Sequence, residues 1–215
     1  PDKKDFKIRG VRSLVRGQDN LGIRLPCRCL VEVMDKNHMV YIRKGLNRNN
    51  GTAQRDILIV NEDGSIDQST PVIFDFARIT SIKAYPVTER PITIKGGTFT
   101  TIANQDTTRR GYYNRGILIR RSGTTIEGVT HLVTGEGDQG APYTGFITVN
   151  HAADIVISDC VFTGHKTYIT YKYGKPVNKG TYDTNANSSV NILWKNCSQT
   201  NDIDNGTYWG IFTSN

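Results

Sequence analysis

The chain has 215 residues, of which 37% are hydrophobic, and it carries a formal net charge of +7. This length suffices for one sizeable core, or one core with a small cap, and the absence of a run of about 18 apolar residues argues against a membrane-spanning helix. A basic surface attracts polyanions such as nucleic acid, anionic lipid or acidic polysaccharide. A solvated basic face without a partner is the commoner reason for a charge this small.

The first 85 residues contain strand-like segments and no repeat. "LVEVMDKNHMVYIRKG" (30–45) and "RDILIVNEDGSID" (55–67) predict strands with turns at Lys-Asn and Asp-Gly. "DFKIRGVRSLVRG" (5–17) fits a short helix or a strand, and Gly10 disfavours the helix. We expect residues 1–85 to form β-hairpins that cap the fold that follows, because an open sheet end needs a cover.

A repeat begins near residue 90. Four segments share an apolar residue, a spacer, a Gly/Asp/Asn-type residue and a small residue: "ITIKGGTF" (92–99), "TTIEGVTH" (124–131), "IVISDCVF" (155–162) and "ILWKNCSQ" (192–199). Their apolar positions lie 32, 31 and 37 residues apart, and are Ile94, Ile126, Ile157 and Trp194. This spacing predicts stacked coils in which each strand pairs with its equivalent one repeat later, in parallel sheets.

A second series interleaves with the first. Its strands start at Gly116, Gly145, Gly180 and Gly210. The last three of them end at Asn150, Asn185 and Asn215. Because stacked coils bring like residues together, we expect the three asparagines to stack at one bend. For the same reason we expect Cys160 and Cys197 to be adjacent, buried and reduced.

The stretch "GFITVNHAADIVISDCVF" (145–162) resembles the coils of the pectin lyase-like, right-handed parallel β-helix superfamily. In its polygalacturonase branch the repeats have the form G-F-D-I…N-V-x-I-x-N-C. The resemblance covers roughly residues 90–215 and implies an all-β fold with about four β-helix coils over residues 86–215. Lyases, hydrolases, epimerases and phage tailspikes share the coil motif, so it implies a fold and no particular activity.

The two ends of the chain carry expectations of their own. Pro1 stands where a Met would start a chain, so we expect that a leader or a longer N-terminal part was removed. Asn215 closes a strand of the last coil without a cap. We therefore expect a fragment, or a coil end that self-associates or is covered by another chain.

The loops before the four glycines carry most of the candidate binding residues. The segment "HKTYITYKYGKPVNKG" (165–180) is one of them. Stacking would bring these loops to one sheet edge, where aromatic rings pack on sugar rings and cations pair with carboxylates or sulfates. The candidates for substrate binding are Arg109, Arg110, Tyr113, Arg115, Tyr143, Tyr171, Tyr173, Tyr182, Tyr208 and Phe212. Alternatively, Tyr caps the apolar edge of each coil and Lys keeps the loops soluble.

Catalytic residues are harder to assign. The polygalacturonase resemblance places a catalytic, outward-facing Asp at the third position of G-F-D-I, and the matching residues are Leu118, Ile147, Tyr182 and Phe212. No carboxylate occupies these positions, which argues against an inverting carboxylate pair and predicts an apolar strip facing a groove. Further candidates are His165, Lys172 and Asp183, although alternation points Asp183 inward. Calcium assists lyases of the superfamily, and Asp138, Asp202 and Asp204 are candidate ligands.

These observations predict an extracellular, periplasmic or cell-surface β-helix that binds an acidic polysaccharide, as part of a lyase or a glycoside hydrolase. The alternative is a non-catalytic adhesin, tailspike or structural surface protein. A shaft of that kind should have short loops, whereas these loops are long, uneven and rich in functional groups. No nucleic-acid-binding motif is present, so nucleic acid is not an expected partner.

Overall fold

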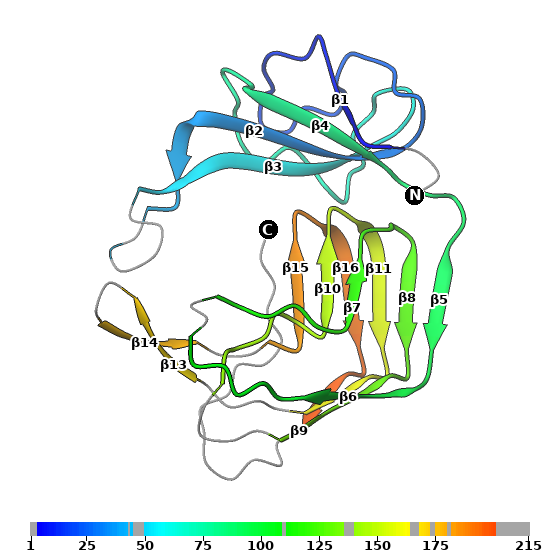
Figure 1. Ribbon diagram of the computed structural model, residues 1–215. Helices are drawn as coiled ribbons and strands as arrows, with labels where there is room; N and C mark the ends of the chain where they lie inside the picture. The colour runs from blue at the N-terminus through cyan, green and yellow to red at the C-terminus, as the bar shows by residue number, and fades with distance from the viewer. Residues whose placement is uncertain are drawn as a thin grey trace. The chain divides into compact units, whose positions relative to one another are not determined.

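A computed structural model describes residues 4–42, 44, 50–108, 111–135, 140–163, 168–172, 175–179 and 182–200, the segments 168–172 and 175–179 by their backbone only. These residues form strands and turns, and none of them lies in a helix (Figure 1). Within this part of the chain, no helix could therefore cross a membrane. The chain divides into two compact units. Unit 1 holds Pro1–Glu89, His151–Ala153 and Ser188–Asn191, and unit 2 holds the remainder.

Unit 1 is built on a four-stranded antiparallel sheet in the order β1-β4-β2-β3. The strands are β1 (Phe6–Lys7), β2 (Cys29–Val40), β3 (Thr52–Val60) and β4 (Ser81–Pro86). The segment predicted as helix or strand thus contributes β1, and Leu14 forms an isolated bridge with Phe76. No helix forms there.

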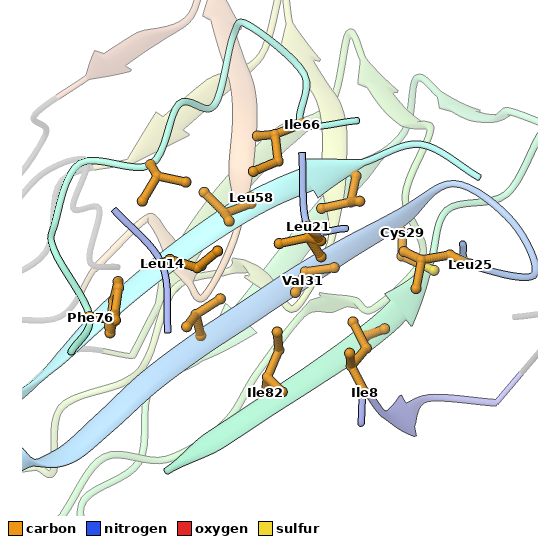
Figure 2. Packing of buried hydrophobic residues seen from close by; sticks show 14 of the residues in the cluster. Ile8, Leu14, Leu21, Leu25, Cys29, Val31, Leu58, Ile66, Phe76 and Ile82 are labelled. Atoms are coloured by element: carbon orange, nitrogen blue, oxygen red, sulfur yellow. The ribbon is translucent and has the colours of Figure 1, made fainter. Parts of the chain in front are cut away.

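The core of unit 1 follows from alternation along β2. Val31 and Val33 are fully buried on one face of the sheet, together with Leu58 from β3. Leu14 and Phe76 cover this face (Figure 2). Alternate residues of a strand point to opposite faces, so the intervening residues of β2 and β3 form a second apolar cluster. That cluster consists of Leu30, Ile57, Ile59 and Ala153.

One of the two predicted turns is confirmed and the other is wrong. Gly64 has a φ of 87°, and its N–H donates to the Asn61 carbonyl over 3.0 Å, which closes the expected Asp-Gly turn. At Lys36 the chain does not reverse. Strand β2 continues with a register shift between Asp35 and Met39, which is the geometry of a bulge.

Unit 2 consists mainly of three parallel sheets, in the orders β15-β10-β7, β16-β11-β8-β5 and β17-β12-β9-β6. The chain visits the sheets in turn and then returns to each of them, so every strand lies beside its equivalent from the previous turn (Figure 1). This arrangement of parallel sheets is compatible with a β-helix. The strands of the first two turns are β5 (Ile92–Lys95), β6 (Thr98–Ile102), β7 (Ile117–Ile119), β8 (Thr124–Glu127) and β9 (Thr130–Thr134).

The later turns of unit 2 repeat the pattern. They supply β10 (Ile147–Asn150), β11 (Ala153–Ser158), β12 (Val161–Thr163), β15 (Thr184–Asn187), β16 (Val190–Lys195) and β17 (Ser198–Thr200). Between β12 and β15, the segment rich in lysine and tyrosine forms an antiparallel hairpin of β13 (Tyr168–Lys172) and β14 (Lys175–Lys179).

The first repeat series has the predicted register. Ile94 pairs with Ile126, and Ile126 pairs with Ile157. Ile126 and Ile157 are fully buried, whereas Ile94 in the first turn remains 37% exposed. Equivalent apolar residues therefore stack in a continuous interior row.

The predicted cysteine stack is also confirmed in its main feature. Ser198 pairs with Val161 and donates its N–H to the Cys160 carbonyl over 2.9 Å, which brings Cys197 beside Cys160. Both thiols are free. Cys160 is fully buried, but Cys197 is only half-buried, contrary to the expectation that both are buried.

The predicted asparagine stack is wrong. Asn150 pairs with Asn187, and Asn185 pairs with Thr148. Val161 pairs with Ser198, 37 residues later, and eleven residues separate Asn150 from Val161 just as they separate Asn187 from Ser198. The bends that follow Asn150 and Asn187 therefore contain the same number of residues, and both sheets have the 37-residue spacing at this turn. The 35-residue spacing of the glycines is not the spacing of the strands. Asn215 lies outside the described residues.

The predicted outward position of Ile147 is also wrong. Ile147 pairs with Ile117, one residue away from the alignment expected for Gly116 and Gly145, and it is fully buried. The partner of exposed Leu118 is Thr148, which in turn pairs with Asn185. A slip of one residue exchanges the two faces of a strand.

Candidate functional site: a tyrosine cluster beside Arg115

The loops that precede β7, β10 and β15 continue the parallel pairing of their strands. Tyr113 and Tyr143 form a parallel bridge, and the N–H of Tyr182 donates to the Tyr143 carbonyl over 3.3 Å. This pairing collects aromatic side chains from three successive turns on unit 2. We call Tyr112, Tyr113, Arg115, Tyr143 and Tyr182 the tyrosine cluster.

The rings of the cluster lie in two pairs. Tyr112 and Tyr182 are stacked, with ring centroids 5.6 Å apart and an interplanar angle of 24°. Tyr113 and Tyr143 are tilted by 43° at 6.1 Å. Both separations are typical of favourable aromatic contacts. Tyr143 is buried, at 7% exposure, whereas the other three side chains are half-buried.

Arg115 ties the two pairs together. Its guanidinium carbon lies 4.9 Å from the centroid of the Tyr143 ring, which is a cation–π contact. Its Nη2 donates to the Tyr182 carbonyl over 3.0 Å, and its Nε donates to the Thr144 carbonyl over 3.3 Å. Arg115 therefore fixes the spacing between successive turns and places a positive charge among the rings.

Two residues that sequence reasoning missed hold the hydroxyls of the tilted pair. The Tyr113 hydroxyl donates to Asp106 Oδ2 over 2.6 Å. The Tyr143 hydroxyl accepts from the backbone N–H of Asn104 over 2.7 Å. Asp106 stands seven residues before Tyr113 in the same loop, and the polar run "ANQDTT" (103–108) is the signal that could have pointed to it.

The protonation state of Tyr112 limits its chemistry. Burial, together with the hydrogen bond to Tyr182, raises the pKa of Tyr112 well above its ordinary value. The phenol therefore stays protonated at neutral pH, and Tyr112 can donate a hydrogen bond but is a poor candidate for a general base.

Asp183 follows Tyr182 directly and is fully buried, as alternation predicted. Its carboxylate accepts a hydrogen bond from Gln199 Nε2 of β17. Its backbone carbonyl accepts from Ile147 N–H over 3.1 Å. These contacts support a structural role for Asp183.

Of the ten predicted binding residues, the structure brings together Tyr113, Arg115, Tyr143 and Tyr182. Tyr171 and the catalytic candidate Lys172 lie on β13, which is described by its backbone only. The remaining predicted residues lie outside the described part of the chain: Arg109, Arg110, His165, Tyr173, Tyr208 and Phe212, with the candidate metal ligands Asp138, Asp202 and Asp204. Among the residues that are described, no group of three His, Cys, Asp or Glu side chains is arranged to hold a metal ion.

A second polar cluster, also missed from the sequence, lies in unit 1 around Glu32. Ser188 Oγ donates to Glu32 Oε1 over 3.1 Å, and Arg55 Nη1 donates to the same oxygen over 3.3 Å. His151 Nε2 is 3.7 Å from Glu32 Oε2, and the imidazole packs on the Tyr85 ring at 4.3 Å. These contacts lower the pKa of Glu32 despite its burial, the largest contribution coming from His151.

Comparison with known proteins adds no relative. No protein-family model matches the chain, and a search of curated proteins finds no match.

Proposed function

We propose that this protein is an exported, right-handed parallel β-helix of the pectin lyase-like type that binds an acidic polysaccharide through the tyrosine cluster. The three parallel sheets with equivalent residues in register support the β-helix part of this proposal. In the proposed fold, residues 86–215 form the coils and residues 1–85 cap one end.

The observation that carries the binding function is the stacked pair of Tyr112 and Tyr182 beside Arg115. Half-buried tyrosine rings offer flat apolar faces at a fixed spacing, which suit the C–H faces of pyranose rings. The rings are held by backbone pairing and by Arg115, so little conformational entropy is lost when a ligand binds.

The positive charge of the chain and of the tyrosine cluster favours an anionic glycan as the ligand. The chain carries +7 overall, and Arg115 places a cation among the rings. A uronate carboxylate or a sulfate is the natural partner of a guanidinium. The adjoining loop segments contribute further cations to the sequence, at Arg109, Arg110, Lys172, Lys175 and Lys179.

The proposed activity is binding, within a carbohydrate-active enzyme of the lyase or glycoside hydrolase type. Tyr112 stays protonated and Asp183 is buried against Gln199, so neither supplies a base for a sugar bound on the cluster. In this proposal the reacting groups come from the loop that contains His165 and Lys172, with Ca²⁺ as an assisting cation in the case of a lyase.

Affinity electrophoresis on gels containing polygalacturonate, a sulfated glycan or neutral dextran tests the proposal. We expect the two acidic gels to retard the protein and dextran not to. Tyr182→Ala should weaken retardation about fivefold or more, the scale of one aromatic contact of about 1 kcal/mol.

Tyr41→Ala is the matched control, because Tyr41 is 63% exposed and belongs to unit 1. This variant should bind like the wild type. Equal retardation by neutral and acidic glycans, or retardation unchanged by Tyr182→Ala, would remove the proposed function and leave the fold intact.

A further inference from the structure

Two cysteines meet where the chain enters β2. Cys27 Sγ and Cys29 Sγ lie 3.9 Å apart, and both residues are buried, at 8% and 0% exposure. They belong to the main core of unit 1, of which Cys29 is labelled in Figure 2. The pair is therefore held within a packed interior.

The backbone on either side fixes this approach. Cys29 pairs with Val60 of β3 on one side and with Pro86 of β4 on the other. The carbonyl of the intervening Arg28 accepts from Val87 N–H over 2.9 Å. Arg28 itself forms an ion pair with Asp67 at 3.6 Å. Since alternate residues of an extended segment share a face, the two thiols are aimed into the same space.

We propose that Cys27 and Cys29 form a reversible disulfide, so that this Cys-Arg-Cys segment is a thiol–disulfide site in the core of unit 1. With glutathione disulfide as the oxidant, one cysteine thiolate attacks it and releases one glutathione thiol. The second cysteine then displaces the other glutathione. Two S–H bonds and one glutathione S–S bond are lost, one protein S–S bond forms, and two molecules of reduced glutathione carry away both protons and both electrons.

The geometry also predicts that the bond is easily reversed. Only one residue separates the cysteines, so the bond closes a very short loop and removes little entropy from the unfolded chain. A bond that adds so little stability should be open to reduction by excess reduced glutathione.

The other thiol pair provides the contrast within the same chain. Cys160 donates to the Ser158 carbonyl over 3.1 Å, and Cys197 donates to the Ile157 carbonyl over 3.4 Å. Cys29 Sγ likewise donates to the Cys27 carbonyl over 3.3 Å. We assign the redox site to Cys27 and Cys29 because their sulfurs approach each other directly at 3.9 Å.

The test uses the full chain with Cys160→Ser and Cys197→Ser, which leaves only the proposed pair. The reduced, folded protein is incubated in buffers of increasing glutathione disulfide, quenched in acid and alkylated, and its intact mass is measured. We expect a species that is two hydrogens lighter and carries no alkyl group. Excess reduced glutathione should convert this species back to a doubly alkylated one. If these substitutions prevent folding, disulfide mapping of the wild-type chain gives the same readout.

Cys27→Ser in the same background is the control, because it removes the bond and leaves Cys29 in place. Two alkyl groups at every glutathione ratio would overturn the proposal. So would a bond that forms only in the urea-unfolded chain, or one that appears as mixed disulfide with glutathione or as a dimer. Circular dichroism of each sample establishes that the folded protein is the one measured.

Discussion

Gly116 illustrates how one residue can be fixed by the stacking of successive turns. Its φ is 71°, and a Cβ at this position would lie 2.1 Å from the carbonyl oxygen of Phe146, on the neighbouring turn. The same carbonyl accepts the N–H of Ile117 over 2.7 Å. Any side chain would therefore have to break the ladder between β7 and β10.

Gly116→Ala should destabilise the protein by clearly more than the roughly 1–2 kcal/mol that a left-handed conformation costs a non-glycine residue. Gly128→Ala is the matched control, since Gly128 has a φ of 64° with open space around the missing Cβ. Urea denaturation measures both. Equal losses for the two variants would show that the close approach to Phe146 does not exist.

Glu32 is a charged residue of unit 1 whose ionisation is coupled to folding. Its side chain is mostly buried and accepts hydrogen bonds from Arg55 and Ser188. Its pKa is lowered from the ordinary 4.5, so its carboxylate form is favoured by folding. The stabilisation is complete above the unfolded pKa and is lost as the pH falls through 4.5 and then through the folded pKa.

Glu32→Gln should therefore lower the free energy of unfolding at pH 7 by about 1–2 kcal/mol, the scale of hydrogen bonds to a charged group. The difference from the wild type should shrink as the pH falls below 4.5, where the wild-type carboxyl becomes protonated. Glu62→Gln removes the same charge at an exposed position and should leave the pH profile unchanged. A difference between wild type and Glu32→Gln that stays constant from pH 7 to pH 3 would contradict this assignment.

Strand β11 contributes buried residues to the interior row of unit 2. Ile155 and Ile157 are fully buried, and Val156 between them is half-buried. On the adjacent strand β16, Leu193 is 52% exposed. Because alternate residues of a strand point to opposite faces of the sheet, Ile157 contributes to the interior of unit 2 whereas Leu193 is exposed.

Ile157→Ala should cost about 2–5 kcal/mol, because it leaves a cavity in the middle of the row. Leu193→Ala should change stability by no more than about 0.5 kcal/mol, as for other surface positions. Thermal and urea unfolding of the two variants distinguish them. Similar losses would mean that Ile157 and Leu193 do not lie on opposite faces of the sheet.

The sequence predicted the rows formed by regular strands, because an apolar residue repeated at a nearly constant spacing is typical of stacked strands. Ile94, Ile126 and Ile157 were aligned correctly on this basis. The asparagine register failed because Gly and Asn mark bends, and bends tolerate insertions that strands do not. Comparing the 35-residue spacing in one series with the 37-residue spacing in the other would have exposed the error.

The candidate site was predictable in part. Tyr113, Tyr143 and Tyr182 were grouped correctly because the loops inherit the register of their strands. The hydrogen-bond partners of these rings could not be predicted, since the bond from the Tyr113 hydroxyl to Asp106 depends on the path of one loop. The Glu32 cluster lay beyond sequence reasoning altogether, because Glu32 and Ser188 are 156 residues apart and no periodicity joins them.

The parallel turns of unit 2 bring together loops that are far apart in the sequence. In the three parallel sheets of unit 2, strands of successive turns pair with one another, so residues as distant as Tyr112 and Tyr182 become neighbours. The net charge of +7 then adds a long-range attraction for polyanions that is independent of any single contact. Together these features favour an extended, charged ligand over a small neutral one.

A crystal structure of the chain with a short uronate oligosaccharide decides whether an acidic glycan binds on the tyrosine cluster. We expect a sugar ring packed against Tyr112 or Tyr182, with a carboxylate within hydrogen-bonding distance of Arg115 or of a cation in the adjoining loops. An oligosaccharide bound elsewhere on the molecule, with the rings of Tyr112 and Tyr182 untouched, would contradict the account.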